Sequence, residues 1–116
     1  MARAQDYSLT TFMTQLRLVG LPALVVFQSE CSPTWRDLRP SIEQIAKKYP
    51  SKVEIRLLDS TDCAQLASEM HVWIVPTILF VKGGREVRRT EGSLPFERLE
   101  AMVVQLFDPV SLYIDS

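Results

Sequence analysis

Apolar residues follow two patterns along the chain, and each pattern predicts a different kind of element. Two runs without a polar face lie at 23–27 and 77–81, and such runs are typical of strands that are covered on both sides of a sheet. Three other stretches, at 9–19, 33–49 and 93–107, repeat apolar residues at intervals of three and four, which predicts amphipathic helices. The chain therefore alternates between helices and buried strands.

The three amphipathic helices have predictable ends and inner faces. Ser8 or Thr10 can cap the first helix, and Gly20 ends it. The second helix is expected to bend at Pro40, because proline removes one backbone hydrogen bond and clashes with the preceding turn. The inner face of the second helix is expected to be Leu38, Ile42, Ile45 and Ala46, and that of the last helix Leu99, Met102, Val103 and Leu106.

Between the long helices, the pattern predicts a third strand, a short helix and a hairpin. Apolar residues alternate with others over 53–59, as in a strand, and Asp62 is a candidate cap for a helix over 63–70. Pro76 should precede the strand at 77–81, because proline has no N–H to offer the sheet. The Lys-Gly-Gly-Arg segment at 82–85 predicts a tight turn into a strand nearer the sheet edge at 86–90.

The order of these elements predicts the architecture. A strand, a helix and a second strand imply a right-handed crossover and a parallel pair, whereas the hairpin adds antiparallel strands. The expected fold is α/β, with a mixed parallel and antiparallel sheet and helices on both faces. No repeat or linker divides the sequence, so residues 1–116 are interpreted as one domain with a core at about 8–107 and a tail at 108–116. Residues 1–7 fit either an edge strand or a disordered arm.

Composition narrows the classes of partner and cofactor. The 116 residues carry a formal net charge of -1, which argues against nucleic acid as a partner, because phosphate binding needs a basic face. No apolar run reaches the roughly 18 residues of a membrane helix, so no membrane partner is expected. Two cysteines, Cys31 and Cys63, are too few for a disulfide scaffold and, without histidine partners, for a zinc site. We expect a reduced, cytoplasmic monomer without metal or cofactor. Arg88 and Arg89 are expected to lie on a solvated face.

The second half of the chain resembles the thioredoxin family. The resemblance rests on Val75-Pro76-Thr77, the apolar strand that follows, the Lys-Gly-Gly turn, the next strand and Gly92. It implies a thioredoxin fold and a cis peptide bond before Pro76, which faces the redox site in that family. The predicted order of strands and helices agrees with that fold independently of any motif.

The first half of the chain departs from the family at the redox site itself. Thioredoxins carry Trp-Cys-Gly-Pro-Cys there, and the first cysteine attacks a substrate disulfide before the second resolves the mixed disulfide. Here the segment is Glu30-Cys31-Ser32-Pro33-Thr34-Trp35, and the chain has no Cys-x-x-Cys. The buried aspartate that helps the resolving cysteine in the family is replaced by valine at both candidate positions, Val25 and Val26. The ordinary dithiol mechanism is therefore not expected.

Two alignments of this segment with the family remain open. The first alignment places Cys31 on the family's attacking cysteine, so that Thr34 takes the place of the resolving one. It needs one extra residue before Pro40. Matching by spacing, without gaps over about residues 23–92, puts Ser32 in place of the attacking cysteine and Trp35 in place of the resolving one. The ungapped alignment is preferred because it covers this stretch without an insertion.

The resemblance implies two classes of function. In the first, Cys31 forms a mixed disulfide with a client protein or glutathione, and an outside thiol releases it, so that the protein is at most a monothiol disulfide oxidoreductase. In the second, a redox-inactive adaptor or chaperone binds extended client segments. A monothiol glutaredoxin with an iron–sulfur cluster matches only loosely. In either main class, the resemblance implies substrate contacts at Trp73, Val75, Pro76 and Gly92.

Overall fold

Four strands form one mixed sheet, in the order β2-β1-β3-β4, in the computed structural model, which describes residues 8–109. The strands are β1 (Ala23–Gln28), β2 (Glu54–Asp59), β3 (Thr77–Lys82) and β4 (Arg85–Glu91). β1 pairs in parallel with β2 and antiparallel with β3, which in turn pairs antiparallel with β4. The parallel pair, the hairpin and the edge position of β4 are thus confirmed. The predicted arm at 1–7 and residues 110–116 of the predicted tail lie outside the described residues.

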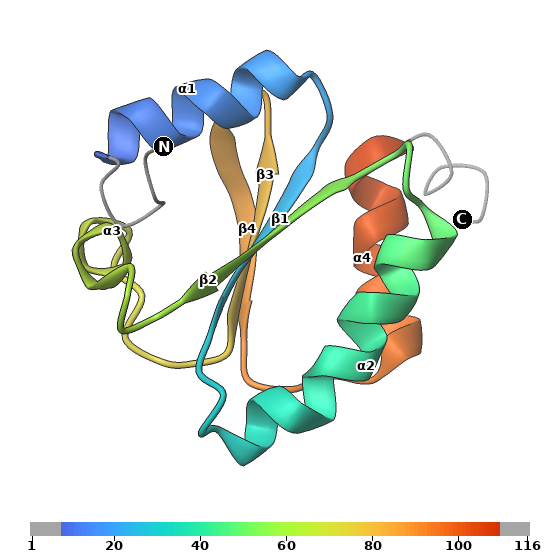
Figure 1. Cartoon of the computed structure of the whole chain (residues 1–116). Coiled ribbons are helices and arrows are strands. Elements are labelled where there is room, and N and C mark those ends of the chain that lie inside the picture. The colour runs from blue at the N-terminus through green and yellow to red at the C-terminus, as the bar shows by residue number, and fades with distance from the viewer. Residues whose placement is uncertain (1–7, 110–116) are drawn as a thin grey trace.

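Helices cover both faces of this sheet, as Figure 1 shows. One face carries α1 (Leu9–Val19) and α3 (Ala64–Glu69), and the other carries α2 (Pro33–Lys48) and α4 (Phe96–Phe107). Both ends of α1 are as expected. At its start, the Ser8 side chain accepts a hydrogen bond from the backbone N–H of Thr11, and after its last residue Gly20 adopts a left-handed conformation with a φ of 83°. The expected α/β architecture is therefore the observed one.

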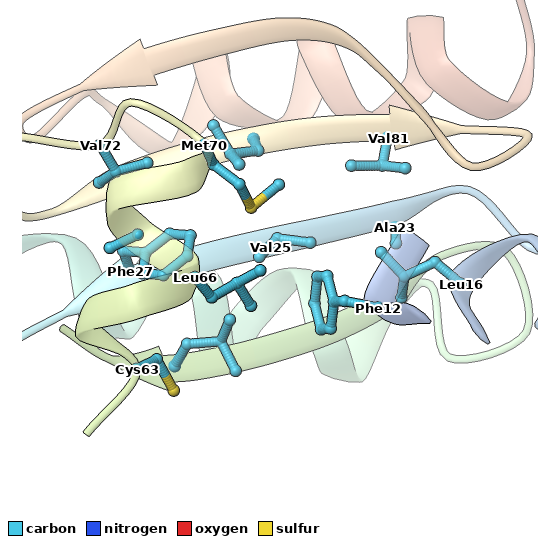
Figure 2. Packing of buried hydrophobic residues seen from close by; sticks show 13 residues of the cluster. Phe12, Leu16, Ala23, Val25, Phe27, Cys63, Leu66, Met70, Val72 and Val81 are labelled. Atoms are coloured by element: carbon cyan, nitrogen blue, oxygen red, sulfur yellow. The ribbon is translucent and has the colours of Figure 1, made fainter. Parts of the chain in front are cut away.

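Two apolar cores lie on the two faces of the sheet. β1 and β3 are central, so their side chains pack alternately into one core and the other, which is why neither strand has a polar face. Figure 2 shows Val25, Phe27 and Val81 meeting side chains of α1 and α3. The opposite core contains the expected stripe of α4 and these residues of α2 and the sheet: Leu24, Val26, Trp35, Leu38, Ile42, Ile45, Ile78 and Phe80.

Two details of the predicted helices are wrong. Ala46 is exposed, because the buried stripe of α2 runs from Trp35 through Leu38 and Ile42 to Ile45, and Ala46 lies one position beyond it. Asp62 does not cap α3, which follows Cys63 without a side-chain cap. Asp59 makes the local contacts instead, since its Oδ1 accepts hydrogen bonds from the backbone N–H groups of residues 61 and 62.

Two further predictions concern less regular positions. Pro40 lies inside α2, which continues to Lys48, and the expected bend there stays a prediction. The alternation at 53–59 is only partly matched by burial: Val53 and Leu58 are buried, whereas Leu57 is exposed. β2 is the second edge strand of the sheet, and an edge strand has a neighbouring strand on one side only. Its side chains are correspondingly less completely covered than those of β1.

Candidate functional site

Strand pairing brings the predicted site residues to one end of the sheet. Phe27 of β1 pairs with Thr77 of β3, which pairs with Glu91 of β4. The segment after β1, the segment before β3 and the segment after β4 therefore meet at this end, as Figure 1 shows. The Val75–Pro76 peptide bond is cis, as expected. The backbone N–H of Gly92 donates to the carbonyl oxygen of Pro76 at 2.8 Å, which fixes the β4–α4 connection beside the proline.

The start of α2 is organised by Ser32. Its backbone is extended and its Oγ accepts a hydrogen bond from the N–H of Trp35 at 3.2 Å, so Ser32 is the N-cap. Cys31 directly precedes this cap, is exposed, and donates its N–H to the Oγ of Ser29 at 3.4 Å. The Cys31 thiol is thus accessible at the beginning of the helix, one position before the residue whose side chain caps it.

Trp35 and Thr34 occupy opposite environments in the first turn of α2. Trp35 is 1% exposed and belongs to the core between α2, α4 and the sheet. Thr34 is exposed. A cysteine at position 34 would therefore be at the surface, whereas a cysteine at position 35 would lie beneath it.

Cys63 differs from Cys31 in its exposure to solvent. It is 4% exposed, lies in the core under α3, and donates its N–H to the carbonyl oxygen of Asp59 at 2.9 Å. Burial raises the pKa of the Cys63 thiol, and the carboxylates of Asp62 and Asp59 raise that pKa further. Both cysteines are free thiols. Burial and the raised pKa both disfavour reaction at Cys63, so the two thiols do not form a matched pair.

The segment before β3 presents apolar side chains to solvent. Trp73 is 71% exposed and Ile74 is 48% exposed, although both are large and apolar. The Trp73 ring meets the ring of His71 edge-on, with 6.2 Å between centroids. Val75 is half-buried and Pro76 is buried. Two neighbouring residues before β3 thus expose apolar side chains beside the backbone that the Gly92–Pro76 hydrogen bond fixes.

The sequence interpretation missed the role of Arg89, which it placed with Arg88 on a solvated face. Arg88 and Arg89 do not share a solvated face: Arg88 donates to the Oε1 of Gln105 on α4, and Arg89 donates to the carbonyl oxygens of Met70 and His71 at the end of α3. Alternation along a strand places consecutive side chains on opposite faces, so the pair could have been separated from the pattern. Their partners could not, because these lie far away in the sequence.

A metal centre finds no support among residues 8–109, where no group of three or more histidine, cysteine, aspartate or glutamate side chains is placed to hold an ion. Across the same residues, no helix has both the length and the apolar character needed to span a bilayer.

Comparison with known proteins decides the family. The Thioredoxin family model matches residues 5–105. The chain belongs to the thioredoxin family. It is 31% identical over 91 residues to the thioredoxin of Peptoclostridium acidaminophilum, covering 78% of this chain and 82% of that protein. It is 26% identical over 95 residues to thioredoxin 1 of Nostoc sp., covering 82% of this chain and 89% of that protein.

A solved structure supports the thioredoxin fold. The X-ray structure of Fasciola hepatica thioredoxin superposes with a TM-score of 0.70 at 24% identity, covering 80% of this chain and 89% of that one. The mixed sheet with helices on both faces is therefore the thioredoxin fold. Within that fold this member of the family has Ser32 at the helix cap, Trp35 in the core and no Cys-x-x-Cys.

Proposed function

We propose that this thioredoxin-family protein acts in thiol–disulfide chemistry through a single cysteine, Cys31, which forms a mixed disulfide with a client protein. The observation that carries the proposal is the contrast between the two thiols. Cys31 is exposed at the start of α2, at the end of the sheet where Pro76 and Gly92 lie, whereas Cys63 is buried. A thiol must be accessible to attack a disulfide.

The chemistry of this step is ordinary thiol–disulfide exchange. The Cys31 thiolate attacks one sulfur of a client disulfide, a new disulfide forms between Cys31 and that sulfur, and the other client sulfur leaves as a thiolate that takes up a proton from water. No oxidant is consumed, because one disulfide replaces another. An outside thiol, such as glutathione, then attacks the mixed disulfide and restores the Cys31 thiol.

The positions that would resolve the mixed disulfide carry no thiol in either alignment. Thr34 offers a hydroxyl at the surface, and Trp35 fills the core with an indole ring. Val25 and Val26 are fully buried in apolar surroundings, where a carboxylate would be costly to keep. These residues support a protein that captures a client and leaves its release to another thiol.

The ungapped alignment fits the start of α2 better than the alternative. In the family the attacking cysteine lies at the N-terminus of this helix, and Ser32 is the N-cap here. Trp35 lies on the buried stripe of α2, in phase with Leu38. Under this alignment Cys31 is a thiol beside the family's nucleophile position rather than in it.

The client is proposed to be an extended protein segment that lies against Trp73, Val75, Pro76 and Gly92. The exposed Trp73 side chain favours this surface, because aromatic side chains supply large contact areas at interfaces. The same observation favours the second candidate function, a redox-inactive adaptor or chaperone that binds the segment without a covalent step. We propose that residues 8–107 form the domain that carries this surface, in a reduced, cytoplasmic setting, with 108–116 as a tail.

Variants at the two cysteines test the proposal. The probe is an extended peptide whose one cysteine carries a nitrothiobenzoate group in disulfide linkage, so that attack releases a coloured thiolate. The wild-type protein and Cys63→Ser should each become linked to one peptide, whereas Cys31→Ser should remain unlinked, as read by intact mass. Equal linkage of Cys31→Ser would overturn the single-cysteine proposal. Reversible peptide binding by Cys31→Ser, together with no linkage of the wild type, would favour the redox-inactive adaptor.

A further inference from the structure

Arg89 connects the edge strand β4 to the end of helix α3. Its Nη2 donates to the carbonyl oxygen of Met70 at 2.8 Å, and its Nη1 donates to the carbonyl oxygen of His71 at 3.0 Å. Glu86, on the same strand, holds the guanidinium from the other side through contacts of 2.6 Å to Nε and 2.7 Å to Nη2. Four hydrogen bonds therefore fix a single side chain between two elements.

The turn that follows α3 receives side-chain donors from Arg89. The last carbonyl groups of the helix, those of Leu66, Ala67 and Ser68, already accept backbone N–H groups of residues 70–72. This six-residue helix has, however, no basic residue in its last turn, so no cation of its own faces its C-terminal end. His71 follows the helix with a φ of 57°, a left-handed conformation that turns the chain away. Arg89 supplies two donors and a positive charge at this point. A planar guanidinium can reach two carbonyl oxygens and a carboxylate at once, whereas a lysine ammonium cannot do so with the same geometry.

The chain that leaves this anchored turn is the segment that presents Trp73 and Ile74. Its first residue, Val72, is buried and donates its N–H to the carbonyl oxygen of Ala67 at 2.8 Å. Its far end is held by Thr77, whose hydroxyl donates to the carbonyl oxygen of Ile74. Between these points Trp73 projects into solvent, where its ring contacts only the edge of the His71 ring among the aromatic side chains of residues 8–109. The segment is therefore held at Val72 and at Ile74, and the turn that leads into it is held by Arg89.

We propose that the Glu86–Arg89 pair is a positioning device for the client-binding segment 72–76, which it holds in register with Cys31. The inference rests on the proposed function of that surface and adds the residues that set it. Arg89 is not a catalytic residue, because it acts through the backbone carbonyl groups of Met70 and His71, just before the segment. Its side chain is 28% exposed and that of Glu86 is 29% exposed, so both are partly shielded from water.

The chain offers a matched control for this device. Arg88 is the next residue on the same strand, carries the same charge, and donates one hydrogen bond to Gln105 on the opposite face of the sheet. Arg88→Met and Arg89→Met thus remove the same charge from adjacent positions, but only the second releases the end of α3. Arg89→Lys keeps the charge without the fork, and Glu86→Gln leaves Arg89 in place with a weaker hold on its guanidinium.

The test compares two probes of Cys31. One is the extended peptide with a nitrothiobenzoate-linked cysteine, and the other is the small disulfide dithiobis(nitrobenzoate), which needs no binding surface. Arg89→Met should lower the second-order rate constant with the peptide by about tenfold or more, because a displaced binding segment misaligns the reacting sulfurs. It should leave the rate with the small disulfide unchanged. Glu86→Gln and Arg89→Lys should show smaller losses, and Arg88→Met none.

Amide hydrogen exchange supplies the readout that separates positioning from a general loss of stability. Arg89→Met should raise exchange at residues 70–75 and leave β1 and β3 protected. Equal peptide rates for Arg89→Met and Arg88→Met, in variants whose strands stay protected, would overturn the inference. If Arg89→Met loses protection from exchange in all strands, Glu86→Gln replaces it, and its rate with the peptide is compared with that of Arg88→Met in the same way. A wild-type protein that does not react with the peptide through Cys31 would instead contradict the proposed function itself.

Discussion

Single residues determine what the start of α2 can do. The hydrogen bond that Ser32 accepts from Trp35 makes it the helix cap, and the burial of Trp35 closes the space beneath it. The sequence located this segment correctly but could not choose between two alignments that differ by one residue. Hydrophobic spacing fixes the phase of a helix along its length, whereas its first turn accommodates a shift of one position at little cost.

Restoring a dithiol tests the preferred alignment. Ser32→Cys combined with Trp35→Cys places a Cys-x-x-Cys at the cap and on the buried stripe, whereas Thr34→Cys pairs Cys31 with a surface position. The first variant should gain the larger activity in the reduction of insulin disulfides by a chemical dithiol. It should also lose about 3 kcal/mol or more of unfolding free energy, because Trp35 leaves a cavity. Higher activity from Thr34→Cys alone would show that the gapped alignment is correct.

Contacts between elements explain features that the sequence pattern predicted only in part. Two glycines between two strands predicted the β3–β4 hairpin, and both adopt positive φ, at 62° for Gly83 and 76° for Gly84. The pattern gave no sign that this turn packs against α1. A Cβ on Gly84 would lie 3.0 Å from the Cβ of Arg17 and 3.1 Å from the carbonyl oxygen of Met13, whereas one on Gly83 would meet nothing within 4 Å.

The two glycines therefore provide a matched pair of variants. Gly83→Ala should cost about 1–2 kcal/mol of unfolding free energy, because alanine is strained in the left-handed region. Gly84→Ala should cost about 1–3 kcal/mol more, because the added methyl group also pushes against α1. Urea denaturation of both variants measures the difference. Equal losses would show that the hairpin is not held tightly against the helix.

The contact between α2 and α4 should make stability depend on pH. Glu100 accepts hydrogen bonds from Lys48 and from the hydroxyl of Tyr49, the latter at 2.8 Å. The hydrogen bond from Lys48, with a smaller contribution from Tyr49, lowers the pKa of the Glu100 carboxyl. The stabilisation is therefore present above the ordinary pKa of a glutamate and is lost as pH falls through the lowered value.

Glu100→Gln tests this dependence. The variant should be less stable than the wild-type protein at neutral pH, and the difference should disappear in acid, where the wild-type carboxyl is protonated. The difference in stability should also shrink at high pH, because Lys48 and Tyr49 then lose the protons that they donate to Glu100. Their pKa values are both raised, so this loss should come above their ordinary values. Thermal unfolding across pH measures the difference. A difference that does not change with pH would contradict the role of the charge.

At the scale of the whole molecule, the elements and their order could be predicted, but contacts between distant segments could not. Buried runs and helical spacing predicted the sheet, its parallel pair and the two helical layers. The link from Arg89 to the end of α3 joins residues 18 and 19 positions apart, and no local pattern encodes it. The burial of Trp35 agrees with the apolar stripe of α2, whereas no local pattern indicated that Trp73 would be 71% exposed. These contacts shape the proposed client-binding surface.

The central claim is that the protein captures a client through Cys31 and cannot release it alone. The most direct measurement follows the wild-type protein by intact mass after reaction with the disulfide-linked peptide, with no other thiol present. The mixed disulfide on Cys31 should accumulate and persist until glutathione is added. Decay of that adduct without added thiol, with the protein losing two hydrogens as an internal Cys31–Cys63 disulfide forms, would contradict the claim.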